Sequence, residues 1–239
     1  MPKVSAMTKM FIRQTVTAVI ALTAGIFFSG CARPRILAQA LTPSYVPSNV
    51  FKEGAVIPSQ IRRVAVLPLS VMNEDDGDMT FGRDTLMPVL VGELNRARAF
   101  EVVTISVDDL RLISGKGVWS AEEKLPLEFF ERIKEKFGAD AVLFSRLTMY
   151  RAYEPLAIGW RIKLIDADEP HILWAVDEVF DARDPSVAAA AMKYAQNTPD
   201  TSSSLSDSRS VLQSPRRFGR YTASAVVQTM PGRAVAAMK

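Results

Sequence analysis

The sequence predicts an α/β protein with a single domain, in which helices pack on a mixed β-sheet of about five strands. Apolar and polar residues alternate over 157–166, which is typical of a strand buried on one face. Leu86, Leu90 and Leu94 recur at the spacing of a helix face. Strand-like and helix-like segments alternate from Arg63 onwards, and this order favours helices layered on a sheet.

The first strand and the first helix of the domain are predicted from an apolar run and a periodic segment. Residues 64–69 are rich in β-branched and large apolar side chains, which indicates a buried strand that ends near Pro68. An acidic turn is expected over 73–78. The helix that follows is expected to run to about Arg98. Its regular part is expected to begin near Pro88, because proline is tolerated in the first turn of a helix.

The middle of the domain adds a strand and two helices. Residues 100–106 predict a second strand, and 108–113 predict a short helix with Asp108 as its N-cap. Residues 127–137 predict an amphipathic helix, because their apolar side chains share one face. Gly138 stands where such a helix ends.

Three strands and an Ala-rich helix complete the predicted domain, which spans residues 61–195. The strands are expected over 141–150, 157–166 and 171–180, and the helix over 185–195. Trp160 lies on the apolar face of its strand and is therefore expected in the core.

The C-terminal part of the chain is predicted as a loop, a helix and a tail. Residues 196–213 are dominated by Ser, Thr, Asp and Asn, which predicts a flexible loop. Ser214 and Pro215 are typical of a helix start, so a helix that packs on the domain is expected over 214–231. Residues 232–239 are expected to fray.

The N-terminal segment has the three parts of an export signal. Basic residues come first, an apolar run follows over 16–28, and Ser29 and Gly30 precede Cys31. The run is shorter than the roughly 20 residues that span a bilayer. A signal peptide is therefore predicted over 1–30.

The segment Phe28-Ser29-Gly30-Cys31 resembles the lipobox of bacterial lipoproteins, with Phe28 where leucine is usual. The resemblance implies cleavage between Gly30 and Cys31, with diacylglycerol and an N-acyl chain on Cys31. The alternative is an ordinary signal beside a chance cysteine, but a lone exported cysteine would be an oxidisable free thiol. Ala32, where aspartate would hold such a protein in the inner membrane, implies an outer-membrane anchor that faces the periplasm.

The prolines that follow the lipobox predict an extended tether over residues 31–60. The charge of the chain excludes a nucleic-acid partner. The chain has 29 basic and 26 acidic residues, but three of the basic residues lie in the predicted signal, so the mature chain is neutral. One histidine and one cysteine exclude most metal cages, and no metal site or cofactor is predicted.

Several segments, taken in order, resemble a group of periplasmic lipoprotein domains. They are 63–68, 100–103, 138–144, 164–167 and 172–174. The group includes the curli-secretion lipoprotein, the lipoprotein activators of penicillin-binding proteins and the N-terminal domain of the Tol-system β-propeller protein. The resemblance implies an α/β binding domain. The pore of the curli-secretion member is not implied, because the turn around 153–155 is too short for membrane hairpins.

Few side chains suggest chemistry. His171 lies at a turn without a nucleophile motif, so no catalytic residue is predicted. Trp119, in a loop, is a candidate surface anchor. Arg216, Arg217 and Arg220 form a basic cluster that could meet phosphate groups or an acidic partner, although a solvated helix face explains them as well.

The sequence therefore predicts a non-enzymatic, lipid-anchored binding or adaptor protein of cell-envelope assembly. An envelope protein is the expected partner, with a peptidoglycan synthase as one candidate implied by the resemblance, and no small-molecule substrate is predicted. The alternative is a self-associating subunit of an envelope secretion complex without its own transmembrane hairpins. An envelope hydrolase is a third hypothesis, which would need His171 as its base.

Overall fold

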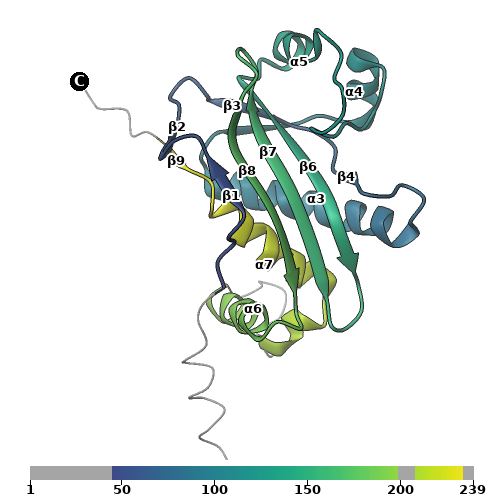
Figure 1. Ribbon diagram of the computed structural model, residues 1–239, viewed down its shortest axis with the longest axis vertical. Coiled ribbons are helices and arrows are strands. Elements are labelled where there is room, and N and C mark those ends of the chain that lie inside the picture. The colour runs from purple at the N-terminus through teal and green to yellow at the C-terminus, as the bar shows by residue number, and fades with distance from the viewer. Residues whose placement is uncertain (1–44, 199–207, 234–239) are drawn as a thin grey trace, which may run out of the picture. The chain divides into compact units, whose positions relative to one another are not determined.

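The computed structural model describes residues 45–198 and 208–233. The predicted signal peptide and lipidation site, at 1–31, lie outside these residues. The described residues form a mixed sheet with helices on both faces, which confirms the predicted α/β class (Figure 1). Labels follow Figure 1.

The main sheet has seven strands, two more than the expected number of about five. In spatial order they are β1 (Val50–Lys52), β8 (Ile172–Asp181), β7 (Ala157–Asp166), β6 (Ala141–Arg151), β3 (Arg63–Val66) and β5 (Glu101–Thr104), while β4 (Ser70–Val71) also pairs with β6. The pairs β3–β5, β3–β6 and β4–β6 are parallel. The pairs β6–β7, β7–β8 and β1–β8 are antiparallel. A separate parallel pair joins β2 (Val56–Ile57) to β9 (Gly232–Arg233).

Two layers of helices cover the sheet unequally. Helices α3 (Gly77–Ala97) and α7 (Pro215–Val227) lie behind β6–β8 in Figure 1, and α6 (Pro185–Asn197) packs beside α7. Helices α4 (Val107–Ser114) and α5 (Phe129–Phe137) cover the upper part of the sheet on its other face. A 3₁₀ helix, Ser208–Leu212, precedes α7.

Two tryptophans in the larger core bind the sheet to the α7 side of the protein. Trp160 and Trp174 are fully buried, as expected for Trp160. The indole Nε1 of Trp160 donates to Oγ1 of Thr222 at 2.9 Å, and that of Trp174 donates to Oγ1 of Thr229 at 3.1 Å. A buried N–H without an acceptor costs about 1–3 kcal/mol, so both threonines are needed at these positions.

Helix α7 approaches α3 closely because residue 219 is glycine. A Cβ atom at Gly219 would lie 2.2 Å from Cδ2 of Leu86, a fully buried residue of α3. Gly82 meets the sheet in the same way, since its Cβ would lie 2.6 Å from Cγ of Tyr150. The two glycines allow α3 to pack against both the sheet and α7.

The predicted tether cannot extend to residue 60, because residues 45–60 belong to the domain. Tyr45 packs edge-to-face on Phe180 with ring centroids 5.4 Å apart. Strand β1 pairs with β8, and Ile57 is buried. The prolines of this segment concealed two short strands whose stability comes from cross-strand partners rather than from local preference.

The C-terminal boundaries also differ from the prediction. Helix α6 runs on to Asn197, and the 3₁₀ helix occupies the end of the predicted loop 196–213, while 199–207 lie outside the described residues. Helix α7 over Pro215–Val227, with Ser214 as its N-cap, agrees with the expected start. The first two residues of the predicted tail 232–239 form β9.

Two helix starts were predicted wrongly. Helix α3 begins at Gly77 rather than near Pro88, because the carboxylate of Asp76 accepts hydrogen bonds from the backbone N–H of residues 78 and 79. Pro88 lies inside this helix, where burial of its neighbours outweighs one lost hydrogen bond. Ser106, not Asp108, caps α4, with its Oγ 3.0 Å from the N–H of Asp109.

We predict opposite effects of Gly→Ala at two helical positions. Gly219→Ala should lower the free energy of unfolding by about 1–3 kcal/mol, because the methyl group overpacks against Leu86. Gly92→Ala is the matched control. It should raise stability by up to about 1 kcal/mol, because a methyl group there meets no atom within 4 Å and alanine favours the helix. Urea unfolding of both variants checks this, and equal effects at the two sites would contradict the packing described.

Candidate functional site

One half of one sheet face is left without a helix. In Figure 1, α4 and α5 stand beside the upper end of the sheet, where they pack on β3 and the start of β6, and no helix of the described residues lies over the lower part of β6, β7 and β8 on this face. We call this surface the open face and define it by eight residues: Phe51, Met72, Arg146, Met149, Arg161, Lys163, Asp177 and Val179.

A row of polar residues crosses the open face from β4 to β1. Ser70 pairs with Arg146, Arg146 pairs with Arg161, and Arg161 pairs with Asp177. The backbone N–H of Asp177 then donates to the carbonyl of Asn49 at 3.1 Å. We call these five residues the polar row.

The polar row places two guanidinium groups directly opposite each other. Arg146 on β6 and Arg161 on β7 are cross-strand partners, and like charges in that relation destabilise a sheet. Lys163 adds a third cation two residues from Arg161 on the same face. The fold therefore needs acids close by.

Two carboxylates neutralise these cations in part. Asp177 accepts a hydrogen bond from Nε of Arg161 at 2.8 Å and pairs with its Nη2 at 2.6 Å. Glu122 lies 2.9 Å from Nζ of Lys163 and 3.6 Å from Nη1 of Arg146. Three cations thus meet two acids, which leaves one positive charge in excess at this site.

Glu122 comes from the loop between α4 and α5, and not from the sheet. Ser120 holds its side chain by a hydroxyl hydrogen bond, and Lys163 holds it from β7. Burial acts to raise the pKa of Glu122, but the hydrogen bonds from Ser120 and Lys163 outweigh it and hold that pKa below its ordinary value. Glu122 is therefore ionised at neutral pH.

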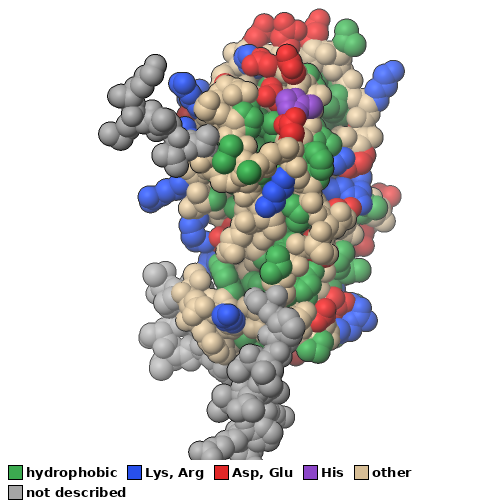
Figure 2. Space-filling view, turned by 60° about the vertical axis from the view of Figure 1, so that its left-hand side comes forward, with side chains coloured by type: hydrophobic (Ala, Val, Ile, Leu, Met, Phe, Trp, Pro, Cys, Tyr) green, Lys and Arg blue, Asp and Glu red, His purple; other side chains and the backbone are tan. Residues whose placement is uncertain are grey.

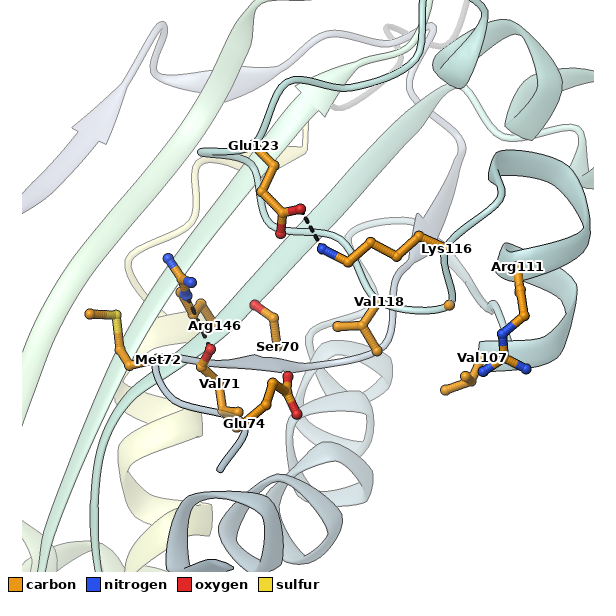
Figure 3. Close-up of a pocket in the computed structure, with 11 residues that line it drawn as sticks. Ser70, Val71, Met72, Glu74, Val107, Arg111, Lys116, Val118, Glu123 and Arg146 are labelled. Atoms are coloured by element: carbon orange, nitrogen blue, oxygen red, sulfur yellow. Dashed lines mark hydrogen bonds and ion pairs between the residues drawn. The ribbon is translucent and has the colours of Figure 1, made fainter. Parts of the chain in front are cut away.

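Hollows lie on both sides of Glu122. The first has a volume of about 420 Å³ and lies between the end of β4 and the start of the loop that follows α4. Figure 3 shows the guanidinium of Arg146 beside Met72 in this hollow, with its Nε 3.4 Å from the carbonyl of Val71. The second, of about 300 Å³, is lined by Phe51, Glu122, Arg161 and Lys163 among others.

Apolar side chains surround these charges. Phe51 and Met72 are each 53% exposed, Val179 is 43% exposed and Met149 is 39% exposed. Between them the central strands carry Gly159 and Ala175, and Thr148 and Met149 fill the space beside Gly159. Exposed apolar groups around partly buried arginines are typical of a protein-binding surface.

The structure places Trp119 differently from the expected surface anchor. Its ring is half-buried and packs edge-to-face on Phe129, with centroids 5.7 Å apart. Its Nε1 donates to Oγ of Ser114 at 2.7 Å, and Nζ of Lys116 lies 5.2 Å above the ring. Trp119 therefore closes the smaller core beneath α4 and α5.

The predicted basic cluster lies far from the open face, because α7 covers the opposite side of the sheet. Arg216 is exposed there, while Arg217 and Arg220 are half-buried. Nη1 of Arg217 donates to Oγ of Ser210 at 2.6 Å, which joins α7 to the 3₁₀ helix.

His171 lies on the surface, among acids. Figure 2 shows the histidine, in purple, beside acidic side chains. Its Nε2 is 3.0 Å from Oε2 of Glu53, so it ties the end of β1 to the β7–β8 turn. No group of three or more His, Cys, Asp or Glu that could hold a metal ion occurs within 45–198 and 208–233. In the same ranges, no helix is long and apolar enough to cross a membrane.

Arg146 was not predicted as a site residue from the sequence. Residues 141–150 lack the clean alternation of 157–166, because the apolar Val142 and Phe144 share the strand face of Arg146. Its pairing with Arg161 could not have been found from the pattern either, because a register shift interrupts the β6–β7 ladder after Leu147.

Comparisons with known proteins do not assign this chain to a family. No protein-family model matches the chain, and no curated protein matches it. Among solved structures, the PelC dodecamer from Paraburkholderia phytofirmans is 13% identical, with 77% of this chain and 98% of that chain covered and a TM-score of 0.44. Lipoprotein GNA1162 from Neisseria meningitidis is 17% identical, with 62% and 100% covered and a TM-score of 0.40.

The LpoB C-terminal domain from Salmonella enterica is 16% identical, with 54% of this chain and 86% of that chain covered and a TM-score of 0.33. TM-scores and identities this low establish neither a shared fold nor a shared function. What this protein does must therefore be inferred from its own surface.

We predict that His171 makes stability pH-dependent. The carbonyl of Glu169, and then the charge of Glu53, raise the pKa of His171 above its usual 6.5. A raised folded-state pKa means that the stabilisation is fully present below about pH 6.5 and is lost as the pH rises through the folded-state value. The urea midpoint should fall more between about pH 5.5 and about pH 8 in the wild type than in His171→Gln.

Glu169→Gln serves as the control for this measurement, because it keeps the backbone carbonyl that the imidazole meets. Its pH dependence should match the wild type. An unchanged pH dependence in His171→Gln would show that this imidazole contributes nothing to stability.

Proposed function

We propose that this protein is a non-enzymatic, lipid-anchored binding domain of the bacterial cell envelope, and that its open face docks another envelope protein. The observation that carries the proposal is the uncovered half of the sheet, where four exposed apolar side chains surround the polar row. A sheet face of this kind buries apolar area on binding and offers arginines as central contacts.

The chemistry of the site supports binding rather than catalysis. The acids of the open face are engaged with neighbouring cations, since Asp177 holds Arg161 and Glu122 holds Lys163. His171 could act as a base only in company with a nucleophile and an oxyanion site. Its described neighbours are Glu53 and the carbonyl of Glu169 instead.

The anchor is proposed at Cys31, with the domain on the periplasmic side of the outer membrane. Because the domain begins at Tyr45, the tether spans Cys31 to Tyr45 and not the thirty residues expected. At about 3.3 Å per residue, that length allows at most about 45 Å between the lipid and the domain. A partner that binds the open face is therefore met close to the membrane.

We predict that photocrosslinking from the open face captures another envelope protein. A photoreactive amino acid at Val179 or Met149, in the full lipidated chain in cells, should give crosslinked bands. The same group at Glu135, which is exposed on α5, should give none of these bands. Equal crosslinking from Glu135, or none from either open-face position, would contradict docking there.

The mass of the crosslinked band separates the partner from a second copy. A band that contains only this chain would favour the self-associating secretion subunit over the adaptor. A band that contains another envelope protein supports the adaptor and identifies its target.

We also predict that Cys31→Ser abolishes lipidation. Fatty-acid labelling should be lost and the chain should keep its signal peptide, because Cys31 is both the proposed acyl acceptor and the residue before which the peptide is cut. Ala32→Asp is the matched variant. It should keep the lipid but shift the protein to the inner-membrane fraction, and fatty-acid labelling of Cys31→Ser would contradict the proposed anchor.

A further inference from the structure

We propose that the open face binds a segment of the partner that carries both acidic and apolar side chains, and that Arg146 is the side chain that binds its carboxylate. This inference rests on the docking function proposed above. Glu122 is the internal carboxylate that stands beside Arg146 when the partner is absent.

Arg146 is less engaged than the other cations of the open face. Arg161 donates one hydrogen bond from Nε to Asp177 at 2.8 Å, with its Nη2 2.6 Å from the same oxygen, and Lys163 lies 2.9 Å from Glu122. Arg146 lies farther from its neighbours, with Nε 3.4 Å from the carbonyl of Val71 and Nη1 3.6 Å from Glu122. Charge-assisted bonds between a guanidinium and a carboxylate measure about 2.7–2.9 Å. The donors of Arg146 are therefore available to a closer acceptor.

The position of Arg146 makes its charge costly without such an acceptor. Its side chain is 23% exposed, so water screens the charge less than on an open surface. It also faces Arg161 directly across the β6–β7 ladder. A carboxylate brought by a partner would offset both effects, and the planar guanidinium favours bidentate binding of that group.

Glu122 shows which chemistry the site accepts. Its carboxylate contacts Lys163 on β7 and approaches Arg146 on β6. Glu122 itself lies in the loop between α4 and α5, and not on these strands. Lys163 and Ser120 hold Glu122 at close range, so it cannot also close on Arg146. The loop therefore leaves one carboxylate position on Arg146 unfilled.

The apolar rim indicates a peptide segment. A small anion would use Arg146 and Lys163 but would leave Phe51, Met149 and Val179 exposed. A segment with acidic and apolar side chains fills both parts of the face, and in extended form its alternate side chains would point the same way. The excess positive charge of the site matches its acidic residues.

The test measures the affinity of the full lipidated chain, in neutral detergent micelles, for a defined probe. The probe is a short fluorescein-labelled peptide with the repeat Glu-Glu-Val-Val, so that each face of the extended chain carries both residue types. Its control is the same peptide with Gln for Glu. Fluorescence anisotropy should show tighter binding of the Glu probe. Equal binding of the two peptides, or no binding of either, would overturn the proposal.

Arg146→Gln should weaken binding of the Glu probe about tenfold, the loss expected when one charge-assisted bond is removed. Arg62→Gln is the matched control, because Arg62 is exposed at the start of β3 beside Asp140. It should leave the affinity unchanged. Arg146→Lys, which keeps the charge and the fold but loses the planar fork, should fall between the two. Equal affinities of Arg146→Gln, Arg146→Lys and Arg62→Gln would overturn the assignment.

Glu122→Gln should change the affinity for the Glu probe in the opposite direction. Loss of the internal charge should tighten binding of the Glu probe about threefold, because the partner's carboxylate no longer meets Glu122 beside Arg146. A weaker affinity would show that Glu122 supports the site rather than occupying part of it. That result would overturn its role as the internal carboxylate.

Two further measurements separate this inference from the function on which it rests. If Arg146→Gln crosslinks to the partner from Val179 as strongly as the wild type, docking stands and the carboxylate contact fails. If no open-face position crosslinks, the docking function fails. Binding to phosphatidylglycerol vesicles that depends on Arg146, without binding of the Glu probe, would replace the peptide by a lipid headgroup.

Discussion

The close approach of α3 and α7 to one side of the sheet is the constraint on which the rest of the structure depends. Gly82 and Gly219 leave room for Tyr150 and Leu86, so both helices come near enough to bury one sheet face. Thr222 and Thr229 then accept hydrogen bonds from the indoles that this burial removes from water. On the other face, α4 and α5 are the helices found among the described residues, and they pack at the upper end of the sheet.

The open face follows from this arrangement and has its own electrostatic balance. Strands β6 and β7 bring arginines opposite each other, which the sheet tolerates because Asp177 and Glu122 stand nearby. One acid comes from the neighbouring strand and is fixed by the ladder. The other comes from a loop and depends on Ser120 and Lys163 for its position. One acid is therefore positioned by the sheet itself and the other by its side-chain contacts.

The parts of the fold that were predictable are those with a local pattern. Strand β7 alternates cleanly, α5 has one apolar face before Gly138, and both were placed correctly to within two residues. Strand β1 has three residues among prolines and exists because β8 offers it an edge. No local pattern records such a partner. The N-cap at Asp76 was not predicted either, because an acidic run is typical of a turn as well as of a helix start.

The candidate site was harder to predict than the fold, because it depends on register. Arg146 and Arg161 are 15 positions apart in the chain and meet only through the β6–β7 pairing with its shift after Leu147. Tryptophan and clustered arginines attract attention in a sequence, but Trp119 serves a core and Arg217 holds a neighbouring segment. The contacts that define this surface join residues that belong to no motif in the sequence.

The pairing of β1 with β8 has a mechanical consequence. Any force between the anchor proposed at Cys31 and the domain would enter through the segment that begins at Tyr45 and continues into β1. Tyr45 on Phe180, and Glu178 accepting from the N–H of Ser48 at 2.7 Å, take up that load before the ladder does. A partner that pulls on the open face thus loads a strand of the same sheet to which it is bound. Tension at the proposed anchor and binding of a partner at the open face would therefore both act on the main sheet, the first through β1.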